Sequence, residues 1–220
     1  MSIAIVSSTS FADIAWAKTS PFLQNKVKIA VTMPETNDYT IVPGKRVGNI
    51  RANSTPADLV RIFGRKNVQL ENIRAGEGES DIFLPAALIR SQPNTKASLT
   101  VIWSDERRNK VMLVRAIDGR WHTAAGIRVG MTYPQLRKIV GKFQVSGFGW
   151  LFDGIVNNRS EYLEIRTGAD EAIPKFAFGE GLSIADNDPR WKKTAMKIVQ
   201  LSVSLGYCKN NFLPSPGDCQ

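Results

Sequence analysis

The chain has 220 residues, of which 43% are hydrophobic and 22% are charged. A chain of this length and composition can bury a core, which excludes a disordered or fibrous protein. Its 29 Lys and Arg residues outnumber its 20 Asp and Glu residues, and the formal net charge is +9. This balance favours an anionic partner, namely an acidic protein, an envelope component or nucleic acid. Basic residues occur only as scattered pairs, so nucleic-acid binding is an alternative that we do not favour.

The N-terminal segment, residues 1–25, has two interpretations. Residues 3–6 are apolar, and Ala15-Trp16-Ala17 has the form of a signal-peptide cleavage site, as expected for a signal-peptide remnant. A positively charged start is missing and Asp13 interrupts the apolar stretch, so an ordinary strand or helix fits as well. We expect a periplasmic or secreted protein, with a cytoplasmic location as the alternative. No run of about 20 apolar residues is present, so no membrane-spanning helix is expected.

The two cysteines both lie in the C-terminal tail, residues 206–220. Cys208 and Cys219 flank a Pro-Ser-Pro-Gly sequence (residues 214–217), which is strong turn chemistry that can fold the tail back on itself. We therefore predict a Cys208–Cys219 disulfide, which an oxidising compartment would preserve. Two free cysteines are the alternative.

Residues 26–118 are predicted to form a first α/β module with leading strands. Residues 26–42 are extended, because hydrophobic residues alternate there with polar or small ones. A short helix follows, for which Thr55 is a typical N-cap and Gly64 a typical stop. Its apolar face consists of Leu59, Ile62 and Phe63. Strands are predicted at residues 82–84, 98–103 and 110–117.

Residues 119–205 are predicted to form a second module of the same kind. Thr132 and Gln135 have the spacing of a capping box, and Gly141 is the stop. The apolar face of this helix consists of Leu136, Ile139 and Val140. Strands are predicted at residues 150–156, 161–166 and 198–205, with an insertion near 168–193. The helix segments 50–64 and 127–141 share six of 15 residues at a constant offset of 77, which favours a duplication.

This arrangement resembles a known superfamily. Gly130-Met131-Thr132, followed by Leu136 and Gly141, is similar to the module opening of the β-lactamase inhibitory proteins and the small outer-membrane-assembly lipoproteins. In the first copy, Asn53-Ser54-Thr55 replaces it. The resemblance covers residues 48–118 and 126–205, and it implies an exported, non-catalytic binding protein whose sheets form a concave, partner-binding face. No lipobox cysteine lies near the start, so no lipid anchor is expected.

The sequence offers little for catalysis. His122 is the only histidine, and no nucleophile elbow, paired metal-ligand motif or phosphate-binding glycine loop is present. We therefore predict a protein that is not an enzyme and needs no cofactor or metal. A hydrolase that uses carboxylates such as Glu79/Asp81 or Asp105/Glu106 is the less favoured alternative.

Large aromatic residues and paired arginines are the remaining candidates for partner binding. Trp103 shares a strand face with Leu99 and Val101, so we assign it to the core. The candidate partner-binding residues are Trp121, Phe148, Trp150, Arg51 and Arg128. The fold class predicted is α+β, with two tandem modules of a helix followed by an antiparallel sheet, which either share one curved sheet or form separate sheets. The predicted function is recognition of a protein or an anionic envelope component through a sheet face.

Overall fold

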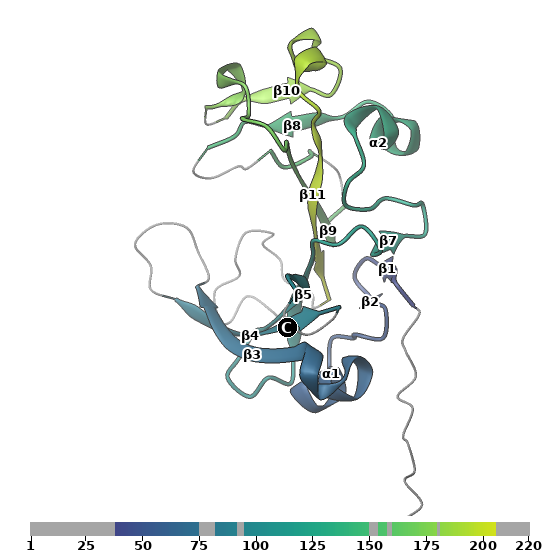
Figure 1. Ribbon diagram of the computed structural model, residues 1–220, viewed down its shortest axis with the longest axis vertical. Helices are drawn as coiled ribbons and strands as arrows, with labels where there is room; N and C mark the ends of the chain where they lie inside the picture. The colour runs from purple at the N-terminus through teal and green to yellow at the C-terminus, as the bar shows by residue number, and fades with distance from the viewer. Residues whose placement is uncertain are drawn as a thin grey trace, which may run out of the picture. The chain divides into compact units, whose positions relative to one another are not determined.

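The computed structural model describes residues 38–74, 82–91, 95–149, 154–157, 160–179 and 181–205. These residues belong to one compact unit that spans residues 33–220. Its helices and antiparallel strands make a mixed α+β fold, as the sequence predicts (Figure 1). The predicted N-terminal segment, most of the leading extended stretch and the C-terminal tail lie outside the described residues.

The first helix, α1 (Pro56–Phe63), begins and ends where the sequence predicts. The Thr55 hydroxyl accepts a hydrogen bond from the Asp58 N–H at 3.3 Å, and the Asp58 carboxylate accepts from the Thr55 N–H at 3.0 Å. This reciprocal pair satisfies two donors that the helix itself leaves free. Gly64 has a φ of 83°, a backbone conformation that glycine adopts without strain, and it ends the helix.

The second helix, α2 (Tyr133–Val140), is also confirmed, and each of its bounds lies 77 residues after that of α1. Gln135 Oε1 accepts from the Thr132 N–H at 2.9 Å, as a capping box requires. The predicted apolar face is only partly correct. Leu136 is fully buried, but Ile139 and Val140 are 37% and 42% exposed. Their equivalents in α1 lie closer to the core, where Phe63 contacts Trp121 edge to face.

The main sheet has six antiparallel strands in the order β3-β4-β5-β6-β11-β9. The first four are β3 (Val68–Arg74), β4 (Phe83–Arg90), β5 (Ala97–Trp103) and β6 (Val111–Ala116). The last two are β11 (Lys197–Ser204) and β9 (Leu163–Gly168). Five of these six strands match predicted strands. Strand β3 was not predicted, because its polar sequence and exposed edge position hide the usual hydrophobic alternation.

Two smaller sheets accompany the main one. One has the order β2-β1-β7, with β1 (Thr40–Val42), β2 (Arg46–Val47) and β7 (His122–Thr123). The other pairs β8 (Gln144–Ser146) with β10 (Ser183–Ala185). Single bridges from Val145 to Val156 and from Ile155 to Arg166 connect β8 with β9. The predicted insertion near 168–193 therefore contributes strand β10, together with the 3-10 helices η2 (Lys175–Ala177) and η3 (Pro189–Lys193).

Strands from both halves of the chain build one core face. Register places Leu99, Ala116, Leu201 and Ile165 in a row across β5, β6, β11 and β9, and none is more than 1% exposed. Directly opposed residues project from the same side of a sheet, so this row faces the core. Pairing between β6 and β11 thus joins strands of the two predicted modules in one sheet.

Trp103 is fully buried, which confirms its assignment to the core. Its indole Nε1 donates a hydrogen bond to the Ser54 carbonyl at 2.8 Å. Since Ser54 directly precedes the α1 cap, this bond fixes the start of the helix against the sheet. Within the described residues, no helix has the length and apolar character needed to cross a membrane.

The buried helix residues are expected to carry most of the helix–core stability. Leu59→Ala and Leu136→Ala should each lower the free energy of unfolding by about 2–5 kcal/mol, because each leaves a cavity at a fully buried site. Val140→Ala is the control and should change it by no more than about 0.5 kcal/mol. Equilibrium unfolding in urea measures all three. Similar losses in all three variants would contradict the packing described for α2.

Candidate functional site

The face of the main sheet opposite the core, here called the outer face, carries a polar row. Register aligns Thr100 on β5 with Arg115 on β6, then with Ser202 on β11 and Glu164 on β9. These residues alternate along their strands with the buried core row, so they project from the other side. The row combines side chains from both halves of the chain.

The acidic end of the row is well connected. Glu164 Oε1 accepts hydrogen bonds from Arg166 Nε at 2.8 Å and from Ser202 Oγ at 3.3 Å. Gln200 donates in turn to the Ser202 hydroxyl at 2.9 Å. Glu164 and Arg166 therefore form an ion pair, and Glu164 makes no direct contact with Arg115.

Arg115 lies next to this cluster without a contact of its own. It is half-buried, and within the part of the chain that the structure describes it forms no hydrogen bond or ion pair through its side chain. Burial is the largest cause that lowers the pKa of Arg115 below its ordinary value, and repulsion from Arg166 lowers it further. Attraction to Glu164 raises this pKa, but it is the smallest of the three effects. A guanidinium nevertheless stays charged at neutral pH. Arg115 is therefore a positive charge with poor hydration and no counter-ion in contact, an environment that favours an incoming anion.

A small apolar cluster occupies the same face nearer to β4. Leu84, Ala86, Ile102 and Met112 are at most 7% exposed and form a cluster separate from the main core. Register puts Leu113 opposite Ile102, two residues before Arg115 on β6. The outer face is therefore apolar toward β4 and polar from β6 to β9.

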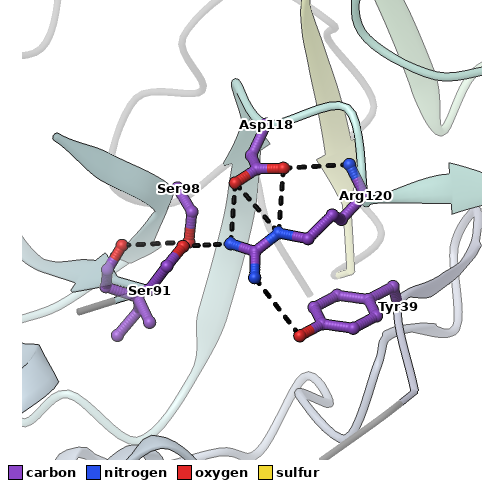
Figure 2. A network of polar contacts seen from close by, with 6 residues as sticks. Tyr39, Ser91, Ser98, Asp118 and Arg120 are labelled. Carbon is purple, nitrogen blue, oxygen red and sulfur yellow. Dashed lines mark hydrogen bonds and ion pairs between the residues drawn. The ribbon is translucent and has the colours of Figure 1, made fainter. Parts of the chain in front are cut away.

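A second polar network surrounds Arg120, between β6 and β7. Its guanidinium donates two hydrogen bonds of 3.1 Å and one of 2.7 Å to the Asp118 carboxylate, and one of 3.4 Å to the Tyr39 hydroxyl. It also donates to the Ser91 hydroxyl. Figure 2 shows the guanidinium at the centre, between Asp118 and Tyr39.

This network connects segments that are far apart in the sequence. Tyr39 precedes β1, Ser91 follows β4, and Asp118 follows β6. Nearby, the Ser98 hydroxyl of β5 donates to the Ile89 carbonyl of β4 at 3.2 Å. Hydrogen bonds from Arg120 lower the pKa of Asp118 more than burial raises it. Since both carboxylate oxygens of Asp118 are engaged by Arg120, we interpret the network as a structural link rather than a binding site.

Two of the predicted partner-binding residues are core residues. Trp121 is 2% exposed and contacts Tyr39 and Phe63 edge to face. Phe148 is 4% exposed and contacts Trp191. Neither ring is available to a partner, which corrects their selection as surface anchors. The packing reason is that small neighbouring residues admit the rings: a Cβ at Gly154 would lie 2.2 Å from the Phe148 ring.

The other predicted residues have different outcomes. Arg51 and Arg128 are both exposed and lie at equivalent positions before α1 and α2, as predicted, but the outer-face row includes neither. Trp150 lies outside the described residues, as do Cys208 and Cys219.

The structure places only some of the residues for the alternative chemistries. In the described part of the chain, no group of three His, Cys, Asp or Glu residues could hold a metal ion. Asp105 and Glu106 lie in the turn between β5 and β6, and Glu79/Asp81 lies outside the described residues. His122 starts β7, where its Nδ1 lies 2.9 Å from the Arg120 carbonyl.

Sequence reasoning missed Arg115, Glu164 and Arg166. One signal was present: Arg115 is the only charged residue in the otherwise apolar strand β6. Its neighbours could not be identified, because they come from strands about 50 to 90 residues later in the chain.

Comparisons with known proteins leave the family open. No family model matches the chain, and no curated protein matches it. The chain is similar to a solved structure described as the uncharacterized protein yfeY from Escherichia coli, with 12% sequence identity and a TM-score of 0.46. The similarity covers 74% of this chain and 98% of that one.

The Arg120 network should stabilise the protein in a pH-dependent way. The lowered pKa of Asp118 means that its contribution is fully present above the ordinary carboxyl value and is lost as the pH falls through the lowered one. Asp118→Asn should therefore be less stable than wild type near pH 7, and the difference should shrink below about pH 4. Urea unfolding across this pH range measures the difference. If the stability difference between wild type and Asp118→Asn stays constant down to about pH 2, the stabilising role of the ionised Asp118 carboxylate is contradicted.

Proposed function

We propose that this protein is an exported, non-catalytic binding module that recognises an anionic group of a protein or envelope component through the outer face of its main sheet. The observation that carries this proposal is Arg115, a half-buried guanidinium without a contacting counter-ion in the middle of the polar row. A bound carboxylate or phosphate would supply the missing partner, and the planar guanidinium suits both.

The neighbouring groups support an anion site of modest net charge. Arg166 and Glu164 pair with each other at 2.8 Å, whereas Arg115 contacts no acidic side chain among the described residues. Thr100 and Ser202 flank Arg115 in register. The Thr100 hydroxyl can donate to a second ligand oxygen, whereas the Ser202 hydroxyl already donates to Glu164.

Nucleic-acid binding remains the alternative because of the +9 charge. Several basic residues are neutralised locally, since Arg46, Arg61, Arg120, Arg137 and Arg190 each pair with an Asp. Glu164 also interrupts the polar row. A continuous basic stripe, which nucleic-acid binding favours, is not found on this face.

Capture experiments with charge-reversal variants test the proposal. Immobilised wild-type protein is incubated with an envelope extract of the native host, and bound components are quantified. Arg115→Glu should reduce the specific capture at least about tenfold, because it replaces the cation by a repelling charge. Lys138→Glu, at an exposed position on α2, is the matched control and should leave capture unchanged.

Two outcomes would overturn the proposal. If Arg115→Glu and wild type capture the same components equally, the outer face is not the binding site. If nuclease treatment removes the captured material, the ligand is nucleic acid and the proposal fails. Circular dichroism of both variants establishes that they are folded.

Export carries a separate prediction for the C-terminal tail. In protein purified from its native host, Cys208 and Cys219 should resist alkylation until a reductant is added, and the N-terminal segment should be shortened near residue 18. Intact mass with and without reductant measures both. A full-length chain with two reactive thiols would contradict export.

A further inference from the structure

The C-terminal part of α2 carries apolar side chains that the core leaves uncovered. Tyr133 and Leu136, nearer to the start of the helix, are at most 3% exposed and belong to the main core. Ile139 and Val140 continue the same apolar stripe, because side chains three and four residues after Leu136 lie on its face of the helix. They are nevertheless 37% and 42% exposed. The fold therefore leaves two adjacent aliphatic side chains without a partner at the end of this helix.

The equivalent part of α1 is packed. Ile62 and Phe63 occupy the positions that correspond to Ile139 and Val140 at the 77-residue offset, and both are half-buried. The Phe63 ring also contacts Trp121 edge to face. The same helix pattern thus has a packed end in the first half of the chain and an unpacked end in the second.

The two helices also differ in charge. In α1, Asp58 pairs with Arg61 at 2.7 Å, so the charges of this helix cancel. In α2, Gln135 takes the position of Asp58, and no acidic residue is present. Lys138 precedes the exposed apolar pair and Lys142 follows it. Both lysines are exposed, and neither forms an ion pair with any residue that the structure describes.

The segment that packs on α2 adds positive charge. The buried tryptophan of η3 contacts the first residue of α2, with 5.8 Å between the ring centroids. The same 3-10 helix carries two exposed lysines, Lys192 and Lys193. The acidic residues just before it, Asp186 and Asp188, each form an ion pair with an arginine at 2.8 Å. The exposed lysines around α2 are therefore not neutralised by this segment.

We propose that the α2 docking face, defined as Lys138, Ile139, Val140 and Lys142, attaches the protein to the surface of a bilayer that contains anionic phospholipids. The two aliphatic side chains enter the boundary between headgroups and acyl chains, and the flanking lysines interact with lipid phosphates. Lysine suits this surface because its flexible stem lets a point charge follow mobile headgroups. The α2 docking face is independent of the anion site, because α2 packs on the core side of the main sheet and the anion site lies on the outer face.

A bilayer fits the α2 docking face better than a protein partner does. A stable protein complex buries about 800 Å² on each partner, and two partly exposed aliphatic side chains provide only a small apolar area. A bilayer requires no matching shape, and attraction between lysines and anionic lipids adds to the burial of even a small apolar area. The net charge of +9 acts in the same direction.

Co-sedimentation with vesicles tests the proposal. Wild-type protein should bind phosphatidylcholine vesicles that contain about 30 mol% phosphatidylglycerol, and it should bind vesicles of phosphatidylcholine alone at least about tenfold less. Lys138→Glu/Lys142→Glu should lower the partition coefficient at least about tenfold, and Ile139→Ser/Val140→Ser at least about fivefold. Because all four side chains are exposed, these variants should fold, and circular dichroism checks this.

A matched control separates local docking from overall charge. Arg65→Glu/Lys66→Glu changes two exposed residues that follow α1, and it lowers the net charge by the same amount as Lys138→Glu/Lys142→Glu. This control should keep at least about half of the wild-type binding.

A further variant separates this proposal from the anion site. Arg115→Glu should bind vesicles like wild type. Conversely, a detergent-solubilised envelope extract contains no bilayer, so Lys138→Glu remains a valid control for capture through Arg115.

Three results would overturn the proposal. If wild type does not bind the anionic vesicles, the α2 docking face is not a membrane contact and a protein becomes its alternative occupant. If the two charge-reversal variants lose binding equally, overall charge and not α2 is responsible. If Ile139→Ser/Val140→Ser binds like wild type, the apolar pair does not enter the bilayer.

Discussion

Hydrogen bonding between β6 and β11 is the constraint on which the rest of the fold depends. Strand β6 ends the first half of the chain, and β11 is the last strand of the second half, yet they are neighbours in the middle of one sheet. Their register fixes which residues form the buried row and which project from the outer face. A shift of one residue would move Arg115 into the core and expose Ala116, so the apolar core strongly enforces this register.

The candidate anion site is a consequence of this pairing. Arg115 comes from the first half, whereas Ser202 and Glu164 come from the second. Neither half contains the site alone, which links its formation to the folding of the complete sheet. The helices retain the 77-residue offset, in both bounds and caps, that the duplication hypothesis predicts. The sheet departs from a simple repeat, because β10 pairs with β8 outside it.

Local signals made the helices and several strands predictable. Thr55, Gly64 and their equivalents act within one turn of chain, so the sequence alone contains the information. Strands β4, β5 and β6 were recognisable from their apolar residues, whereas polar β3 was not. Burial of the aromatic residues was harder to predict from the sequence. Trp121 is buried by Tyr39 and Phe63, which lie far from it in the sequence. The polar row depends on cross-strand register in the same way.

Arg115 says more about function than the exposed arginines do, because partial burial of its charged guanidinium is unfavourable in free energy. Arg51 and Arg128 are exposed, where water satisfies a guanidinium and neither stability nor function is implied. Arg115 lies half-buried between apolar Val114 and Ala116, and its neighbours satisfy one another instead of satisfying it. A threonine, the residue type found at the neighbouring position Thr100 of the row, would fill position 115 without desolvating a charge. The proposed binding of an anion would offset this cost, and functional sites are where such local costs occur.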